Sequence, residues 1–145
     1  MATEQLHSIH SQAELKSLLS QNKFVVIDFW ADWCPPCKAI GPFYSNLAKT
    51  HSVPGFLAFA KIDVEELPDI TKAYGISAMP SFLVLEDGEP SEGIDVGGAT
   101  AAQVKLIRGA DPKGLTALAA KLKELASQAQ QVSYTEPRWG LGVVN

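Results

Sequence analysis

The chain has 145 residues, of which 19% are charged and 46% hydrophobic, and its formal net charge is −4 at pH 7. This length is sufficient for one domain with a hydrophobic core. The negative charge and the lack of a basic cluster argue against nucleic acid as a partner. The N-terminus shows no secretory signal, and no apolar run is long enough to span a membrane. We therefore expect a cytoplasmic protein in a reducing compartment, with no membrane partner.

The first elements are predicted from capping residues and from hydrophobic spacing. Residues 6–9 are predicted to form a short edge strand. Ser11 and Glu14 form a capping box, in which each side chain accepts a free N–H at the start of a helix. Leucines at helical spacing extend that helix to about residue 22. Residues 23–30 form a nearly continuous apolar run, which is typical of a central strand covered on both faces.

Asp28 is the exception within that central strand. An ionised carboxylate is costly to bury, so its pKa should rise unless the group is paired. Strand ends often turn an aspartate toward solvent, but we favour a functional role because Asp28 lies six residues before the first cysteine. Lys61, in the next predicted strand, is a candidate counter-charge, although lysines are more commonly found at the surface.

The only two cysteines, Cys34 and Cys37, follow this strand at C-x-x-C spacing. Residues 36–51 are predicted to form a helix, so both thiols lie at a helix N-terminus. There the unpaired N–H groups and the helix dipole favour a thiolate. The spacing also brings both sulfurs to one face, close enough to form a disulfide. We expect the first cysteine to face solvent and the second to lie inside the first turn.

Three other interpretations of the cysteine pair are an inert buried pair, half of a zinc site, and a structural disulfide. Zinc would need further ligands, and His7, His10 and His51 lack the spacing to supply them. A structural disulfide that closes so short a loop adds little stability. We therefore expect no metal, and no cofactor other than a reversible Cys34–Cys37 disulfide.

The second half of the chain continues the alternation of strands and helices. Residues 56–64 are predicted to form a second buried strand. Acidic residues and Pro68 begin a helix that ends near Gly75. Residues 81–86 form a third strand, which the turn signal Asp87-Gly88 ends.

A segment rich in glycine, proline, serine and acidic residues, 89–100, then interrupts the pattern. We expect it to be a loop insertion that the fold does not need, because it is too polar to contribute to the core. Residues 102–108 are predicted to form a strand that pairs with residues 82–86. Asp111 is the predicted N-cap of the last helix, with Pro112 as its first residue.

The order of elements is βαβαβ, then a hairpin, then a helix. With right-handed crossovers this order predicts an α/β fold with a mixed central sheet and helices on both faces. We place this domain at residues 1–128 and expect residues 129–145 to form a flexible C-terminal tail.

Between about residues 4 and 126, the sequence resembles the thioredoxin family. The matching positions are Asp28, Phe29, Trp30, Ala31, Trp33, Cys34, Pro36, Cys37, Lys38, Pro42, Lys61, Met79, Pro80, Gly109 and Ala110. The resemblance implies the thioredoxin fold, a cis peptide bond before Pro80, and activity as a protein-disulfide reductase. It implies that Cys34 attacks a substrate disulfide, that Cys37 resolves the mixed disulfide, and that Asp28, near Lys61, handles protons.

The resemblance also implies which residues and partners take part in substrate reduction. The surface that receives the substrate is expected to include Trp33, Pro35, Pro36, Met79, Pro80 and Gly109. Electrons are expected from a separate flavin-dependent thioredoxin reductase, because the chain has no nucleotide-binding glycine motif. We expect a monomer that contributes to cellular redox balance.

The sequence departs from the family pattern at Pro35, where thioredoxins usually carry glycine. Pro35 removes an N–H near the sulfurs and fixes a φ angle, which leaves the reduction potential open. A disulfide oxidase or isomerase on the same scaffold is thus an alternative. A redox-silent interaction module is another, and the presence of both cysteines disfavours it. An alternative alignment gives the role of Gly109 to residues 96–98, but a helix cap directly after Gly109 favours Gly109.

Overall fold

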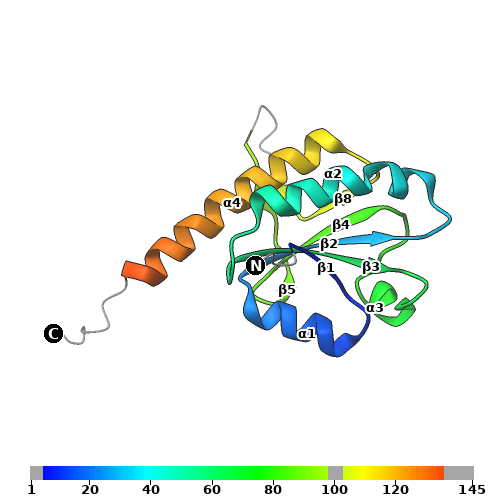
Figure 1. The fold of residues 1–145 in the computed structure, drawn as a ribbon, viewed down its shortest axis with the longest axis horizontal. Helices are drawn as coiled ribbons and strands as arrows, with labels where there is room; N and C mark the ends of the chain where they lie inside the picture. Colours follow the sequence, from blue (N-terminus) through cyan, green and yellow to red (C-terminus); the bar gives the residue numbers. More distant parts are fainter. Residues whose placement is uncertain (1–4, 98–102, 136–145) are drawn as a thin grey trace.

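The computed structural model describes residues 5–97 and 103–135 and shows an α/β fold built on one central sheet (Figure 1). The elements are β1 (Leu6–Ser8), α1 (Gln12–Gln21), β2 (Phe24–Trp30), α2 (Pro35–His51), β3 (Leu57–Asp63), α3 (Pro68–Ala73), β4 (Ser81–Glu86), β5 (Glu89–Pro90), β6 (Ile94–Asp95), β7 (Gln103–Val104), β8 (Leu106–Arg108) and α4 (Pro112–Thr135). Within the described ranges, no helix has both the length and the hydropathy needed to cross a membrane.

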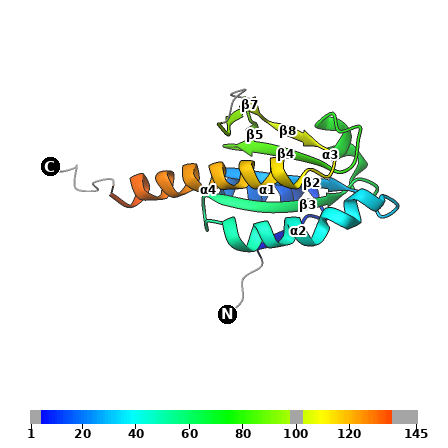
Figure 2. The same ribbon diagram turned by 90° about the horizontal axis from the view of Figure 1, so that it is seen from above.

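The central sheet is mixed, as predicted. Its strand order is β1-β3-β2-β4-β5, and β8 also pairs with β4. β1, β3 and β2 run parallel to one another, whereas β4 runs antiparallel to β2. Helices α2 and α4 cover one face of the sheet, and α1 and α3 cover the other (Figures 1 and 2). The predicted α/β fold, with a mixed central sheet and helices on both faces, is therefore confirmed.

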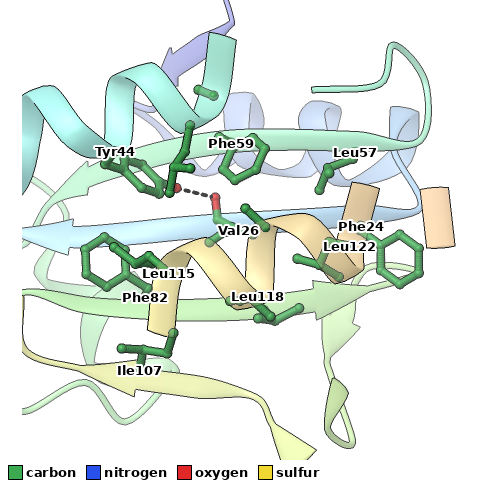
Figure 3. Packing of buried hydrophobic residues seen from close by; sticks show 14 of the residues in the cluster. Phe24, Val26, Tyr44, Leu57, Phe59, Phe82, Ile107, Leu115, Leu118 and Leu122 are labelled. Atoms are coloured by element: carbon green, nitrogen blue, oxygen red, sulfur yellow. Dashed lines mark hydrogen bonds between the residues drawn. The ribbon is translucent and has the colours of Figure 1, made fainter. Parts of the chain in front are cut away.

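Strand β2 is the centre of the sheet, with β3 on one side and β4 on the other. Its side chains alternate between the two faces. Phe24 and Val26 pack into the core under α2 and α4, which Figure 3 shows from close by. Val25 and Ile27 pack into the core on the opposite face. Burial on both faces explains why this strand is a nearly continuous apolar run.

Three helix starts follow the capping residues in the sequence. Ser11 Oγ accepts the backbone N–H of Glu14 at 3.1 Å and begins α1. Asp111 Oδ1 accepts the N–H of Gly114 at 2.9 Å at the start of α4. Helix α2 begins at Pro35, one residue earlier than predicted, because Cys34 itself is the N-cap.

The return strand after β4 is split by an insertion, which differs from our prediction of one strand over residues 102–108. Leu85 pairs with Pro90 in β5, but Leu83 pairs with Leu106 in β8. An uninterrupted strand in the β5 register would pair Leu83 with residue 92. Val84 shows the junction directly, because it accepts the N–H of Ser91 and donates to the carbonyl of Lys105.

The inserted segment therefore begins after Ser91, later than the predicted start at residue 89. It contains the short antiparallel pair β6–β7, in which Ile94 pairs with Val104. Residues 98–102, which include part of the predicted insertion and the start of the predicted strand, lie outside the described residues. Removal of residues 92–105 would rejoin β5 and β8 in register.

The expectation that this insertion contributes nothing to the core is wrong. Ile94 is 5% exposed and belongs to the hydrophobic cluster under α4. Val96 and Val104 pack against the same cluster. These apolar residues alternate with polar ones, so the overall polarity of the segment concealed the face that packs inward.

Helix α4 continues past the boundary that we placed at residue 128. It runs to Thr135 and projects beyond the end of the sheet in both views (Figures 1 and 2). The polar composition after residue 128 therefore marks the point at which the helix extends beyond the sheet, and it does not mark the end of the helix. Residues 136–145 of the predicted tail, and residues 1–4, lie outside the described residues.

We predict that Ile94→Ala lowers the free energy of unfolding by about 2–4 kcal/mol, because it removes a buried side chain and leaves a cavity. Denaturant unfolding measures this directly. Glu92→Ala, an exposed change in the same insertion, is the control and should shift stability by less than about 0.5 kcal/mol. Equal stability of the two variants would mean that the insertion does not contribute to the core.

Candidate active site

A disulfide joins Cys34 and Cys37 at the start of α2, with their Cα atoms 5.3 Å apart. The chain reaches this point through a turn after β2, in which the N–H of Cys34 donates to the carbonyl of Ala31 at 3.2 Å. Cys34 has extended backbone angles and Cys37 lies within the first turn of the helix. The sequence thus places the redox-active pair where a central strand leads into a helix, as predicted.

The helix start supplies a hydrogen bond to the sulfur of Cys34. The N–H of Cys37 donates to Cys34 Sγ at 3.2 Å, so the first cysteine acts as the capping side chain. N-cap side chains accept from the second or third helical residue. The second is Pro36, which has no N–H, so Cys37 is the residue left to donate. This bond and the helix dipole favour negative charge on the Cys34 sulfur.

Pro35 occupies the first position of α2, where an N–H has no partner within the helix. Pro35 therefore removes no intrahelical hydrogen bond, and an N–H at this position would not be the one that donates to the sulfur of Cys34. Pro35 and Pro36 are both exposed beside the disulfide. The structure thus gives no support to our reason for linking Pro35 to the reduction potential through a lost donor.

Exposure does not distinguish the two cysteines in the disulfide form. Cys34 is 3% exposed and Cys37 is 5% exposed. The expectation that Cys34 faces solvent is therefore wrong for this form. A small apolar cluster explains the burial, since Trp30, Val64 and Met79 pack around Ala31 and the two cysteines.

The loop before β4 approaches the disulfide from the side. The Met79–Pro80 peptide bond is cis, and the carbonyl oxygen of Met79 lies 3.6 Å from Cys34 Sγ. Gly109 lies beside this loop, because its N–H donates to the carbonyl of Pro80 at 2.7 Å. Its φ of 94° is in the region that favours glycine. Residues 96 and 97 of the alternative alignment lie in the insertion instead.

Asp28 is buried in β2, with 4% of its surface exposed. It lies on the same face of the strand as Val26, whose carbonyl accepts the Tyr44 hydroxyl at 3.0 Å (Figure 3). Cys37 and Tyr44 share the inner face of α2 at a spacing of two turns. β2 and α2 run in opposite directions. Asp28 follows Val26 along β2 and is therefore closer than Val26 to the start of α2, where Cys37 lies.

The environment of Asp28 favours its protonated form. Its Oδ1 accepts no hydrogen bond from the described residues. Burial raises the pKa of Asp28 to about 7, and the charge of Lys61 keeps that pKa from rising further. Burial and the nearby charge of Asp28 also raise the pKa of Tyr44 well above its ordinary value. Asp28 therefore titrates near neutral pH, as a group that exchanges protons requires.

Lys61 lies directly across from Asp28 in the parallel register of β2 and β3. No ion pair between the two is found among the described side chains. Its Nζ instead lies 5.6 Å from the centre of the Trp30 ring. Lys61 thus lowers the pKa of Asp28 through its charge, without forming an ion pair with it.

The sequence missed two groups that contribute to this site. Val64 belongs to the apolar cluster at the disulfide, but a valine in an apolar strand carries no signal of such a role. Tyr44 lies within the predicted helix 36–51 and is buried in the core. Its hydroxyl donates to the carbonyls of Val26 and Ala60, near Asp28, which helical spacing alone does not reveal.

The arrangement is suited to thiol–disulfide exchange. It brings together a dithiol pair, an N–H donor at one sulfur and a carboxyl group that titrates near pH 7. Among the residues that the structure describes, no cluster of three or more His, Cys, Asp or Glu side chains is arranged to hold a metal. The reversible disulfide itself is the redox group, and the fold and site together define a thiol–disulfide oxidoreductase.

Comparisons with known proteins agree with this class. The thioredoxin family model matches residues 7–109. A thioredoxin-like protein from Fusarium culmorum is 47% identical over 123 residues, which cover 85% of this chain and 95% of the relative. A thioredoxin from Neurospora crassa is 44% identical over 120 residues, which cover 83% of this chain and 88% of the relative.

Solved structures give the same result. The structure of Plasmodium falciparum thioredoxin matches with a TM-score of 0.64 at 36% identity, and the match covers 79% of this chain and 97% of the other. The Malassezia sympodialis thioredoxin structure matches with a TM-score of 0.66 at 31% identity, and the match covers 85% of this chain and 95% of the other. The chain belongs to the thioredoxin family and is a protein-disulfide oxidoreductase.

We predict that Asp28→Asn stabilises the protein increasingly as pH rises. Asp28 ionises near pH 3.8 in the unfolded chain and near pH 7 in the fold. Between these values the folded protein holds a proton that the unfolded chain has lost, so wild-type stability falls as pH rises. The advantage of the Asn variant in unfolding free energy should be larger at pH 8 than at pH 5 by about 2–3 kcal/mol.

Denaturant unfolding at the two pH values measures this difference. Asp32→Asn is the matched control, because Asp32 is an exposed carboxylate in the same segment. It should show no comparable change between the two pH values. An advantage of Asp28→Asn that is equal at pH 5 and pH 8 would contradict a titration of Asp28 near neutrality.

We predict that brief alkylation of the reduced protein near neutral pH labels Cys34 in preference to Cys37. The reason is the N–H of Cys37, which stabilises negative charge on the Cys34 sulfur. Peptide mass spectrometry after iodoacetamide treatment locates the label. Preferential labelling of Cys37 would reverse this order of reactivity.

Proposed function

We propose that this protein reduces disulfide bonds of other proteins with Cys34 as the nucleophile and Cys37 as the resolving thiol. The observation that carries this assignment is the hydrogen bond from the N–H of Cys37 to Cys34 Sγ at the start of α2. It favours the thiolate on the first cysteine, which is the form that attacks a disulfide.

In the first step the Cys34 thiolate attacks one sulfur of the substrate disulfide. The substrate S–S bond breaks, a mixed disulfide with Cys34 forms, and the leaving substrate thiolate takes up a proton from solvent. In the second step the ionised Asp28 accepts the proton of the Cys37 thiol. The Cys37 thiolate then attacks Cys34 Sγ and releases the second substrate thiolate. The substrate gains two electrons, and Cys34 and Cys37 become a disulfide.

Lys61 supports the proton transfer by holding down the pKa of Asp28, which would otherwise be higher because of burial. The substrate contacts the exposed surface around the disulfide. Trp33, Pro35 and Pro36 are exposed on that surface, and Met79 and Gly109 are half-buried at its edge. Pro80, which we expected there, is buried and can only support the surface from beneath. The position of Met79 supports this role, because its carbonyl oxygen lies 3.6 Å from Cys34 Sγ.

The oxidised protein is reduced again by a separate flavin-dependent thioredoxin reductase, which supplies two electrons. The thioredoxin-family protein itself acts in the cytoplasm as a monomer, and it contributes to electron transport and to redox balance there. The absence of a nucleotide-binding glycine motif in the sequence supports a separate protein as the electron donor.

Insulin reduction with NADPH and a thioredoxin reductase tests the proposal. Cys34→Ser should lower the rate to that of the mixture without the protein, because no nucleophile remains. Cys37→Ser should also stop turnover, but it should accumulate a covalent adduct between Cys34 and insulin that mass spectrometry detects. Unchanged turnover in Cys34→Ser would refute the proposed role of Cys34.

A further inference from the structure

Trp33 is a large hydrophobic residue left exposed next to the disulfide. It directly precedes Cys34, and 61% of its surface is exposed. Its indole nevertheless has a fixed partner, because Nε1 donates to Glu65 Oε2 at 2.7 Å. A hydrogen bond of this length to an ionised acceptor is among the stronger ones in proteins. The sequence placed Glu65 only in the first turn of a helix, without a role at the site.

Glu65 lies on a well-supported turn between β3 and α3. Its N–H donates to Asp63 Oδ1 at 2.9 Å, and the N–H of Leu67 donates to the carbonyl of Asp63 at 3.1 Å. The N–H of Val64 donates to the carbonyl of Trp30 at 2.9 Å, which joins this turn to the end of β2. The carboxylate therefore extends from a backbone held by several hydrogen bonds.

The Trp33–Glu65 bond connects two loops that follow neighbouring parallel strands. Trp33 lies in the turn between β2 and α2, and Glu65 lies in the turn between β3 and α3. Figure 1 shows the start of α2 and α3 at the same end of the sheet. The bond thus ties the side chain beside the nucleophile to a second, independently supported segment.

We propose that Glu65 is a positioning residue that holds the Trp33 indole in the orientation in which a protein substrate docks. This inference rests on the proposed function, in which Trp33 forms part of the docking surface. A freely rotating indole would lose conformational freedom on docking, which weakens association. An indole already held by Glu65 loses less, so the benefit appears in substrate affinity and not in the chemical step.

The reduction of insulin by wild type, Glu65→Ala and Glu65→Gln, with dithiothreitol as reductant, tests this role. Glu65→Ala should raise KM for insulin two- to tenfold, equivalent to about 0.4–1.4 kcal/mol at 1.4 kcal/mol per tenfold, with kcat changed less than twofold. Reduction of the small disulfide DTNB should be unchanged, because that reagent needs no docking surface. Glu65→Gln keeps an oxygen acceptor for the indole and should lie close to wild type.

The neighbouring Glu66→Ala is the control for charge, because it removes the same charge without touching Trp33. Glu66 accepts instead from His10. If Glu65→Gln or Glu66→Ala raises KM as much as Glu65→Ala does, then charge attraction explains the effect and the positioning role is wrong. An unchanged KM in Glu65→Ala also overturns that role.

A readout independent of activity is the indole N–H signal of Trp33 in a ¹⁵N NMR spectrum, assigned with Trp33→Phe. We expect this proton to exchange with water faster in Glu65→Ala than in wild type, and at the wild-type rate in Glu66→Ala. Equal exchange in Glu65→Ala and wild type would show that the bond does not hold the indole in solution. Failure of the wild type to reduce insulin would instead reject the proposed function, and the docking role with it.

Discussion

The hydrogen bond from the N–H of Cys37 to the sulfur of Cys34 links the fold of this protein to its chemistry. It exists because a short turn leads from the end of β2 at Trp30 to the start of α2 at Pro35, and Cys34 in that turn occupies the N-cap position that serine or aspartate usually fills. Pro36, at the second helical position, has no N–H that could compete with that of Cys37 for this sulfur. The sheet holds this junction in place, since β2 is paired on both sides along its length. A strand at the edge would give the cysteine pair no comparable support.

The central position of β2, which supports the cysteine pair, also lowers the stability of the fold at Asp28. A carboxyl group buried in β2 without a partner at Oδ1 destabilises the fold once it ionises, and burial raises its pKa for the same reason. Asparagine or an apolar residue would fit the apolar strand better. An acid at this position is consistent with the proposed role of Asp28 as proton acceptor for Cys37, because functional groups of this kind often reduce stability.

Local signals in the sequence predicted the strands, the caps and the cysteine pair, because each depends on neighbouring residues. Ser11 and Asp111 cap their helices as expected, and β2 is buried as its composition indicates. Contacts between distant segments were not predictable in this way. The bond from Trp33 to Glu65 joins two loops, and nothing in either loop specifies the other. The burial of Cys34 likewise depends on side chains from three segments, including Val64 and Met79.

The insertion after Ser91 was misjudged for a different physical reason. Mean polarity describes a segment as a whole, whereas a two-stranded ribbon needs only one apolar face to pack against a helix. Ile94 supplies that face under α4, while β4 keeps its hydrogen bonds through Ser91 and Lys105. The interruption lies toward the end of β4 at Glu86, whereas Pro80 and the disulfide lie at the opposite end. The edge of the sheet can therefore accept an insertion that changes the core without changing the geometry around Cys34.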